Sequence, residues 1–432
     1  MSALMISRLE KFDPVEVGSI DTARRSFCYS PQYLANPDAL PLSASLPLRA
    51  DSYSEQEFRP YFEGLLPEGL SRLALAARLN VREDDYLTLL EACGRECIGD
   101  VLVEGGGSSR FEAGKKRLSG SYEPIDASAM ADLLRNDERI SESNIASRLS
   151  LAGTQGKTGL AHMPGPDMTR GWLLPVGHAA TTHMLKTSHM RDIPENEFVC
   201  MKTAQACGLD VAAVALIDCG RSVLCVERFD RVANATAAGL DVARTHQEDF
   251  AQVFGVLPAS KYAEVEGGSI RAIARFLKWR SLRPARDLAA FTKMLCFSYL
   301  IGNCDAHLKN YSIRFVFEEG RGGGIVLAPA YDFVCTTMFS RFSRNMAMSF
   351  GGVHDIDAVD AQSLDALAGD LGISKSAFKR LVAPIADGLA VALRRAGSGS
   401  LGSVFPSTAY IADEIEEDAY PRIELLKSYC AK

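Results

Sequence analysis

The sequence has no apolar run long enough to cross a membrane. No window of its 432 residues reaches the roughly 18 apolar residues in succession that a membrane-spanning helix needs. Its first residues, MSALMISRLEKFD, also lack the basic start and long apolar run of a secretory signal. We therefore expect a cytoplasmic protein that does not use a membrane as a partner.

The sequence contains fewer basic than acidic residues. The chain has 47 lysines and arginines against 54 aspartates and glutamates, and its formal net charge is -7 at pH 7. A protein that binds nucleic acid alone normally needs a basic face that neutralises phosphates. This balance disfavours a free-standing nucleic-acid binder, so we expect any contact with DNA to come mainly through a partner.

Cysteines at metal-site spacing are missing. The 11 cysteines are scattered, and several stand in apolar runs, where a free thiol behaves as a small buried hydrophobic group. Cys93 and Cys97 are close in sequence, but no second pair follows at the spacing of a zinc site. We therefore expect neither a structural metal nor a disulfide framework.

The composition is otherwise that of a globular protein, with 47% apolar and 23% charged residues. At about 150 residues per domain, the length predicts two or three compact units of an α+β protein. A glycine-rich and then basic stretch between Glu104 and Gly120 indicates a boundary. We divide the chain into a small α+β subdomain (1–103), a linker and helical connection (104–145), a sheet-rich lobe (146–231) and a helical lobe (232–432).

Hydrophobic periodicity locates the main elements. Strands are expected at 147–151 and 157–163, around Trp172 and Met184, and in a hairpin that turns at 219–221, with a helix that ends at Gly208. After about Val232 the pattern turns helical and is interrupted by a strand pair. The strands of this pair are Tyr311–Phe317 and Gly322–Pro329, and the helices are Arg271–Trp279, Asp287–Tyr299, Ser363–Leu371, Ser376–Ala396 and Tyr420–Ser428.

The stretch IGNCDAHLKN, at 301–310, carries the strongest chemical signal. It places Asn310 five residues after Asp305, and Asp332 follows 22 residues later. Protein kinases use this order for a catalytic base and two magnesium ligands. Asp305 would accept the proton of a substrate hydroxyl, while Asn310 and Asp332 supply oxygen atoms to the metal. Taken alone, Asn303 and Asp305 can equally cap a turn.

Lysines supply the candidate phosphate ligands. Lys186 is the single cation in the partly apolar strand THMLKTS, where burial is costly unless a carboxylate or phosphate meets it. Glu195 or Glu197 on the following helix can orient it, and a lysine that snorkels from an edge strand is the alternative. The loop Gly153–Lys157 can place backbone N–H groups against phosphates, or it can be a plain hairpin turn.

Several motifs together resemble the HipA family of bacterial toxin kinases. S-x-A-G-x-Q-x-K begins at Ser150, TH-x-x-K ends at Lys186, VERFDR begins at Val226, IGN-x-D-x-HLKN begins at Ile301, and YDF follows Ala330. PLSASLPL and FEGLLPEG resemble the small N-terminal domain of the same family. The resemblance therefore covers nearly the whole chain.

The resemblance implies a serine/threonine protein kinase with a two-lobed kinase-like fold that uses ATP and Mg²⁺. Such a kinase is the toxin of a type II toxin–antitoxin pair. Its partner would be a small HipB-like helix-turn-helix antitoxin, through which the complex binds operator DNA. A known protein target in the family is an aminoacyl-tRNA synthetase, whose phosphorylation stalls translation and favours persistence.

The resemblance also assigns roles by position. Asp305 corresponds to the proton acceptor, Asn310 and Asp332 to the magnesium ligands, and Lys186 to the ATP lysine. Ser150 corresponds to a serine whose autophosphorylation inactivates the enzyme, although an unmodified hairpin serine remains the alternative. The other residues expected to line the nucleotide are Ala152, Gly153, Thr154, Gln155, Gly156, Lys157, Glu227, Arg228, Phe229, His307, Leu308 and Lys309.

Two other functions fit parts of the pattern. A small-molecule phosphotransferase of the aminoglycoside or choline type uses the same base, asparagine and aspartate, but it would lack the domain that contains FEGLLPEG. A catalytically silent module that only binds an antitoxin and DNA would have no need of Asp305, Asn310 and Asp332 together. The sequence therefore favours the protein kinase.

Overall fold

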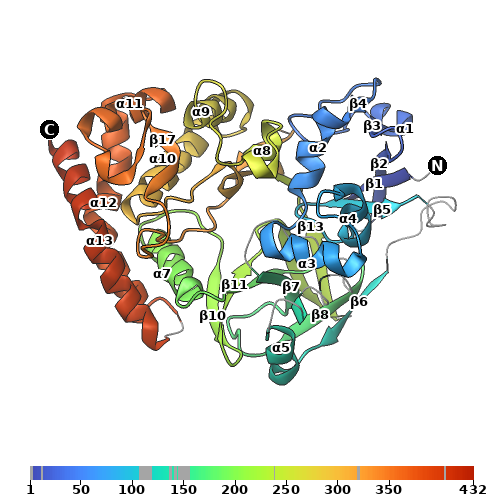
Figure 1. Cartoon of the computed structure of the whole chain (residues 1–432), viewed down its shortest axis with the longest axis horizontal. Coiled ribbons are helices and arrows are strands. Elements are labelled where there is room, and N and C mark those ends of the chain that lie inside the picture. Colours follow the sequence, from blue (N-terminus) through green and yellow to red (C-terminus); the bar gives the residue numbers. More distant parts are fainter. Residues whose placement is uncertain are drawn as a thin grey trace. The chain divides into compact units, whose positions relative to one another are not determined.

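The computed structural model describes residues 3–10, 13–106, 119–135, 139–140, 144, 156–237, 239–318, 322–402 and 405–432. The chain combines helices and strands in two compact units (Figure 1). The first unit consists of Met1–Thr187 and Ile217–Ser260, and the second of Ser188–Leu216 and Lys261–Lys432. Within the described ranges, every helix is too short or too polar to traverse a bilayer.

The first unit contains an antiparallel sheet with the strand order β4-β3-β2-β1-β5. Gly18 of β2 has no room for a side chain, because a Cβ atom would lie 2.1 Å from the carbonyl oxygen of Cys28 on β3. The strands are β1 (Ala3–Glu10), β2 (Asp13–Asp21), β3 (Ser26–Tyr29), β4 (Tyr53–Ser54) and β5 (Val101–Gly105).

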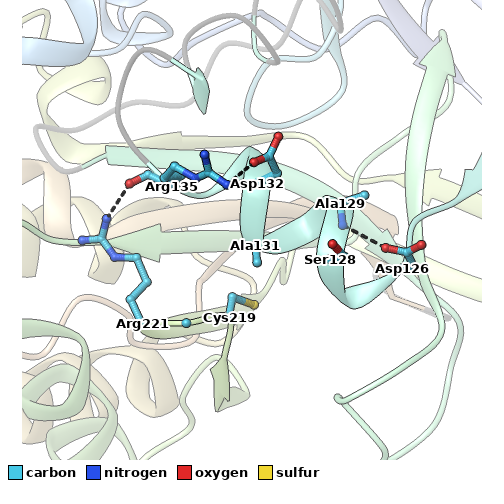
Figure 2. Close-up of a pocket in the computed structure, with 9 residues that line it drawn as sticks. Asp126, Ser128, Ala129, Ala131, Asp132, Arg135, Cys219 and Arg221 are labelled. Carbon is cyan, nitrogen blue, oxygen red and sulfur yellow. Dashed lines mark hydrogen bonds and ion pairs between the residues drawn. The ribbon is translucent and has the colours of Figure 1, made fainter.

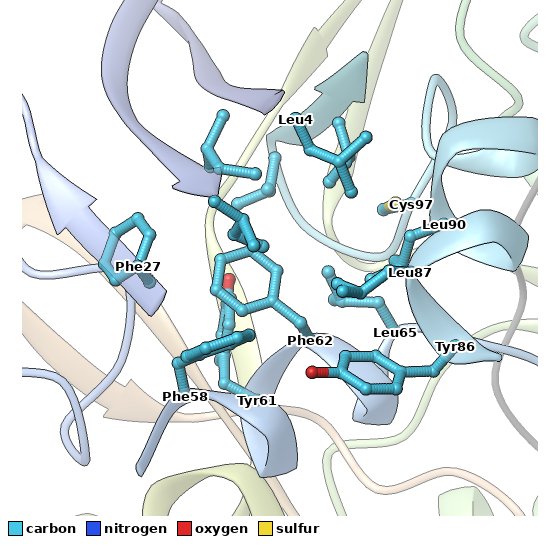
Figure 3. Close-up of a cluster of buried hydrophobic side chains, with 14 of the residues drawn as sticks. Leu4, Phe27, Phe58, Tyr61, Phe62, Leu65, Tyr86, Leu87, Leu90 and Cys97 are labelled. Carbon is cyan, nitrogen blue, oxygen red and sulfur yellow. The ribbon is translucent and has the colours of Figure 1, made fainter. Parts of the chain in front are cut away.

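Helices pack against this sheet and enclose an apolar core (Figure 3). Phe58, Tyr61 and Phe62 from one helix are fully buried, and the ring of Phe62 lies 5.5 Å from that of Phe27 on β3. Burying such aromatic side chains contributes about 1.5–3 kcal/mol each. The helices are α1 (Pro31–Leu34), α2 (Glu55–Gly64), α3 (Gly69–Leu79) and α4 (Tyr86–Cys93).

A second sheet has the strand order β10-β11-β9-β7-β8-β6. One face of it joins Leu160, Leu185 and Cys225 with Trp172 and with Met130 of the short helix α5 in a separate apolar cluster. The elements of this region are β6 (Gly120–Pro124), α5 (Ala127–Leu133), β7 (Gly156–His162), β8 (Trp172–Gly177), β9 (His183–Thr187), β10 (Val214–Asp218), β11 (Ser222–Glu227), β12 (Arg231–Thr236), β13 (Gly239–Arg244), β14 (Gln247–Asp249), α8 (Phe250–Val253) and η1 (Pro258–Ser260).

A buried ionic cluster connects the two sheet regions of the first unit. The carboxylate of Glu96, just before β5, accepts hydrogen bonds from the main chain and hydroxyl of Thr181 at 3.0 and 2.9 Å. It also accepts from the guanidinium groups of Arg228, Arg231 and Arg244. The cluster therefore joins residues that lie far apart in the sequence.

The second unit is mostly helical. Its long helix α12 packs against α7, α10 and α13 (Figure 1). The helices are α7 (Ile193–Ala206), α9 (Ser269–Arg280), α10 (Pro284–Leu300), η2 (Leu308–Asn310), η3 (Ile356–Ala358), α11 (Ala361–Leu371), α12 (Lys375–Gly397) and α13 (Pro406–Ala431). The strands are β15 (Ser312–Glu318), β16 (Gly322–Leu327), β17 (Asn345–Phe350) and β18 (Val353–Asp355).

Most expected elements are confirmed, and two expectations need correction. The last helix does not begin at Tyr420, because α13 starts at Pro406 and continues through Pro421. Pro421 and Glu417 are both exposed, so the carbonyl that loses its helical partner lies on the solvent side. The region after Val232 is not purely helical, since β12, β13, β14, β17 and β18 lie in it.

The missed hairpin of β12 and β13 has weak patterning. Its side chains are mostly exposed or half-buried, so apolar and polar residues do not alternate clearly. The expected strand at 147–151 lies outside the described residues, while its predicted partner is present as β7. The division into four segments stays a prediction.

The buried carboxyl group of Glu248 predicts a pH-dependent stability. Its oxygens accept hydrogen bonds from Ser43 Oγ at 2.5 Å and Ala44 N at 3.0 Å, and burial raises its pKa from 4.5 to about 8. Between these pH values the folded state retains a proton that the unfolded state loses. The contribution of Glu248 to the free energy of unfolding therefore falls as pH rises, by up to about 1.4 kcal/mol per pH unit.

Glu248→Gln should remove this slope, because its amide can donate to Ser43 and accept from Ala44 at every pH. Urea unfolding of both proteins from pH 5.5 to 8 is the measurement, and the variant should gain stability relative to the wild type with rising pH. The exposed control Glu83→Gln should give a curve parallel to that of the wild type. Parallel curves for Glu248→Gln would contradict the assignment.

Candidate active site

The predicted catalytic loop begins where α10 ends. Gly302 has φ of +75°, which favours glycine, and a Cβ atom there would lie 1.9 Å from Thr337 Oγ1. The carbonyl of Gly302 accepts hydrogen bonds from the main chain of Thr336 and Thr337 at 3.0 and 3.2 Å. A sharp turn and a close approach to the 336–337 segment therefore both require glycine at this position.

The structure brings Asn310 and Asp332 together, as the sequence predicts. Asn310 Nδ2 donates to Asp332 Oδ2 at 2.8 Å, and Asn310 Oδ1 accepts from the main-chain N of His307 at 3.2 Å. Asp332 has φ of +62°, a left-handed conformation that costs a non-glycine residue about 1–2 kcal/mol. Asn303 Nδ2 reaches the Asp332 carbonyl at 3.5 Å.

Oxygen atoms from these two side chains fit a magnesium site. Mg²⁺ in proteins usually takes one or two carboxylates, with waters and substrate phosphates as its other ligands. Asn310 is buried and Asp332 is half-buried, so their orientation is fixed by their surroundings. Among the described residues, no group of three or more histidine, cysteine, aspartate or glutamate side chains could form an all-protein metal cage.

Asp305 differs from these residues in being exposed. Its main-chain N donates to Asn303 Oδ1 at 3.2 Å, and its carbonyl accepts from the main-chain N of His307 at 2.8 Å. These bonds form a short turn that holds the carboxylate at the surface. Its Oδ1 atom accepts a hydrogen bond from Tyr262 Oη at 2.8 Å, a contact that the sequence did not predict.

A buried asparagine on α7 fixes the segment after Asp332. Asn196 Oδ1 accepts from the main-chain N of Cys335 at 2.8 Å, and its Nδ2 donates to the Cys335 carbonyl at 3.2 Å. Asn196 is fully buried. The sequence predicts a role for Glu195 or Glu197 but none for Asn196, because a polar residue between two acids gives no sign of burial.

The C-terminal helix α13 supports the other side of the loop. Arg422 is 4% exposed and donates to the Leu300 carbonyl at 3.2 Å and to Asp418. Asp418 also accepts from the Thr337 hydroxyl. Burial alone would raise the pKa of Asp418, but Arg422 and Thr337 outweigh it and the net shift is downward. In sequence, Asp418 and Arg422 resemble an ordinary surface pair four residues apart.

The first unit carries the predicted phosphate-binding lysines. Lys157 of β7 and Lys186 of β9 are directly opposite each other in the antiparallel pair, so both side chains are on the same face of the sheet. They are 9% and 7% exposed. Gly159, Met184 and Val226 continue this face, opposite the apolar cluster. Sequence periodicity had not set this register.

The remaining predicted residues are placed as follows. Glu227 is exposed at the end of β11, and Phe229 is half-buried. Arg228 is 5% exposed, and its guanidinium forms ion pairs with Asp230 and Glu96 instead of an ion pair with Glu227. Leu308, His307 and Lys309 are buried in or beside η2. Ser150, Ala152, Gly153, Thr154 and Gln155 lie outside the described residues, and Gly156 is the first residue of β7.

A surface pocket of about 640 Å³ lies elsewhere in the first unit (Figure 2). It is formed by α5 and the turn between β10 and β11, where Arg221 donates to the Arg135 carbonyl at 3.4 Å and Arg135 forms an ion pair with Asp132. None of the predicted site residues within the described ranges lines it.

Two family models match the chain in order along its length. The HipA N-terminal domain matches residues 12–104, and the HipA-like C-terminal domain matches residues 149–393. A putative kinase, Y4mE, from Sinorhizobium fredii is 35% identical over 380 residues, which cover 85% of this chain and 86% of that protein. The serine/threonine-protein kinase toxin HipA of Shewanella oneidensis is 29% identical over 350 residues, which cover 78% and 76%.

A solved complex of Shewanella oneidensis HipA, HipB and operator DNA provides a structural match. The likeness has a TM-score of 0.79 and 22% sequence identity, and it covers 99% of both chains. It confirms the predicted α+β class and the kinase-like fold.

The contacts of Arg422 predict a loss of stability when its charge is removed. Arg422→Met should lower the free energy of unfolding by about 1–3 kcal/mol, because the Leu300 carbonyl and Asp418 lose a buried charged donor. The half-buried Lys427→Met, on the same helix, should change it by less than about 0.5 kcal/mol, because the ion pair of Lys427 with Glu424 is a long one of 4.0 Å. Urea unfolding measures both, and equal effects would show that Arg422 is not a special contact.

Proposed function

The chain belongs to the HipA family, and on that premise we propose that it is an ATP- and Mg²⁺-dependent serine/threonine protein kinase. The observation that carries the proposal is the hydrogen bond between Asn310 and Asp332 beside the loop that exposes Asp305. Phosphoryl transfer needs a base at the surface and fixed oxygen ligands for a metal. The exposure of Asp305 and the hydrogen bonds of Asn310 and Asp332 support these roles.

The reaction then assigns a separate task to each side chain. Asp305 takes the proton from a serine or threonine hydroxyl, whose oxygen attacks the γ-phosphorus of ATP while ADP leaves. Asn310 and Asp332 would hold Mg²⁺, which neutralises phosphate charge. Asn303, Asn196 and Gly302 are positioning residues, because they fix the backbone that carries these side chains.

The two opposed lysines support a polyphosphate ligand. Like charges directly opposite in a sheet destabilise the pair, and burial adds to that cost. A ligand with several negative charges, such as the phosphates of ATP, would be attracted by both Lys157 and Lys186. The apolar Met184 and Val226 lie on the same face and suit an adenine ring.

The biological role that we propose follows from the named relatives. HipA of Shewanella oneidensis is named a toxin, and its solved complex contains HipB and operator DNA. We assign to this chain a HipB-like antitoxin and contact with operator DNA mainly through it, which agrees with a net charge of -7. Its substrate would be a protein such as an aminoacyl-tRNA synthetase, with inhibition of translation as the result.

Self-inactivation at Ser150 is part of the same proposal. A phosphate there would add about -1.5 to -2 charge to the segment next to Gly153–Lys157. Repulsion from the phosphates of ATP would then favour release of that segment from the nucleotide.

Intact-mass measurement after incubation with Mg²⁺ and ATP tests the catalytic assignment. The unmodified wild type should gain a phosphate on the peptide that contains Ser150, and Asp305→Asn should lower the rate about 10²- to 10⁴-fold while ATP still binds. Asp413→Asn, at an exposed position of α13, is the matched control. An Asp305→Asn variant that remains fully active would overturn the role of Asp305.

Calorimetric ATP binding tests the lysine assignment. Lys157→Met and Lys186→Met should each weaken binding about 10- to 100-fold, because each removes a charged hydrogen-bond donor to phosphate. The measurement uses the Asp305→Asn background to prevent turnover. Lys375→Met, at an exposed ion pair with Asp365, should leave the affinity unchanged. Unchanged affinity in the Lys157 and Lys186 variants would exclude a phosphate contact.

A further inference from the structure

Tyr262 makes a contact that the proposed catalytic roles do not use. Its hydroxyl donates to Asp305 Oδ1 at 2.8 Å, and its ring lies edge-on to His307 with centroids 5.2 Å apart. A general base must lie about 2.6–3.2 Å from the hydroxyl that it deprotonates. The Tyr262 hydroxyl is therefore at the distance from Asp305 that the hydroxyl of a substrate has to reach.

The loop that carries Tyr262 is anchored to the element that holds the catalytic loop. Glu264 Oε1 accepts from the main chain and hydroxyl of Ser349 on β17 at 2.9 and 3.0 Å, and its Oε2 accepts from Ser269 N at 2.6 Å. Two residues earlier on β17, Ala347 N donates to the Cys304 carbonyl at 2.9 Å. One strand thus fixes both sides of the contact.

Tyr262 lies largely outside the core, with one ring edge against His307. It is 54% exposed, although Glu264 two residues later is tightly bonded. Rotation of its side chain can therefore release Asp305 without moving the anchored loop. A hydrogen bond that is positioned by a rigid loop but exposed to solvent can be exchanged for another hydroxyl at small cost.

We propose that the Tyr262 hydroxyl occupies the acceptor-hydroxyl site beside Asp305 and that a serine or threonine hydroxyl of the protein substrate must displace it. This inference rests on the proposed kinase function. Tyr262 then determines which acceptors react, because only a substrate that binds well enough to replace the phenol reaches the base. A water molecule would have to displace the same contact to reach Oδ1 of the base.

A role for Tyr262 in orienting Asp305 predicts the opposite change in rate. If Tyr262 served to orient Asp305, removing its hydroxyl would lower the rate with every acceptor. If it competes with the acceptor, removing it raises the rate. The sign of the change separates the two roles.

Steady-state kinetics of Tyr262→Phe test the proposal. The acceptors are water, followed as ATP hydrolysis, and a synthetic peptide with the sequence of residues 144–158 of this chain. We expect kcat/KM for the peptide to rise about three- to tenfold through a lower KM, with the KM for ATP unchanged and hydrolysis faster. That change equals about 0.7–1.4 kcal/mol, the size of a net hydrogen bond.

Tyr410→Phe is the matched control, because Tyr410 is 55% exposed on α13 and loses the same hydroxyl. Equal melting temperatures of the three proteins exclude a folding effect. A lower or unchanged kcat/KM in Tyr262→Phe, with an active wild type, overturns the acceptor-site role alone. A wild type that is no more active than Asp305→Asn overturns the proposed function, and this inference falls with it.

Discussion

The packing of the first unit depends on the contacts of the buried Glu96 carboxylate. Burial alone would raise its pKa, but Arg244, Arg231 and Arg228 outweigh that effect and lower it to about 2, so the group stays charged inside the protein. Every member of such a cluster needs the others, because a buried charge that loses its partner costs several kcal/mol. The cluster thereby fixes the segment before β5 against the ends of β9, β11 and β13.

This constraint also limits which cations can serve a nucleotide. Arg228 belongs to the motif that resembles a nucleotide-binding segment, yet its guanidinium donates to Asp230, Glu96 and Thr181. Using it for phosphate would take one buried cationic partner away from both Glu96 and Asp230. Lys157 and Lys186 are not among the residues that bind Glu96, and their side chains are on the same face of the sheet.

Local sequence order predicted the part of the site that is local in space. The proximity of Asn310 and Asp332 follows from one short helix and one hairpin, so the local motif was enough to predict it, while the catalytic roles of these residues and of Asp305 stay a prediction. Asn196 and Arg422 act from distant helices, and nothing in their sequence neighbourhoods indicates burial. The pairing of Lys157 with Lys186 depends on the register of the two strands. Hydrophobic periodicity shows which face a residue is on, but a shift of the register by two residues leaves that face unchanged, so periodicity does not predict the partner. Tyr262 was missed because its contact depends on how a loop is anchored.

Two carboxylates of the candidate site accept hydrogen bonds from other side chains of the same chain. Tyr262 donates to Asp305, and Asn310 donates to Asp332. A carboxylate that already accepts a hydrogen bond from a fixed donor has a fixed orientation. A ligand that binds at the same oxygen replaces this hydrogen bond and does not add a new one. The net gain is then the difference between two similar interactions, which is small for each group. In the proposed reaction a substrate hydroxyl would exchange with Tyr262 at Asp305, whereas Asp332 can keep its hydrogen bond from Asn310 and offer its other carboxylate oxygen to the metal.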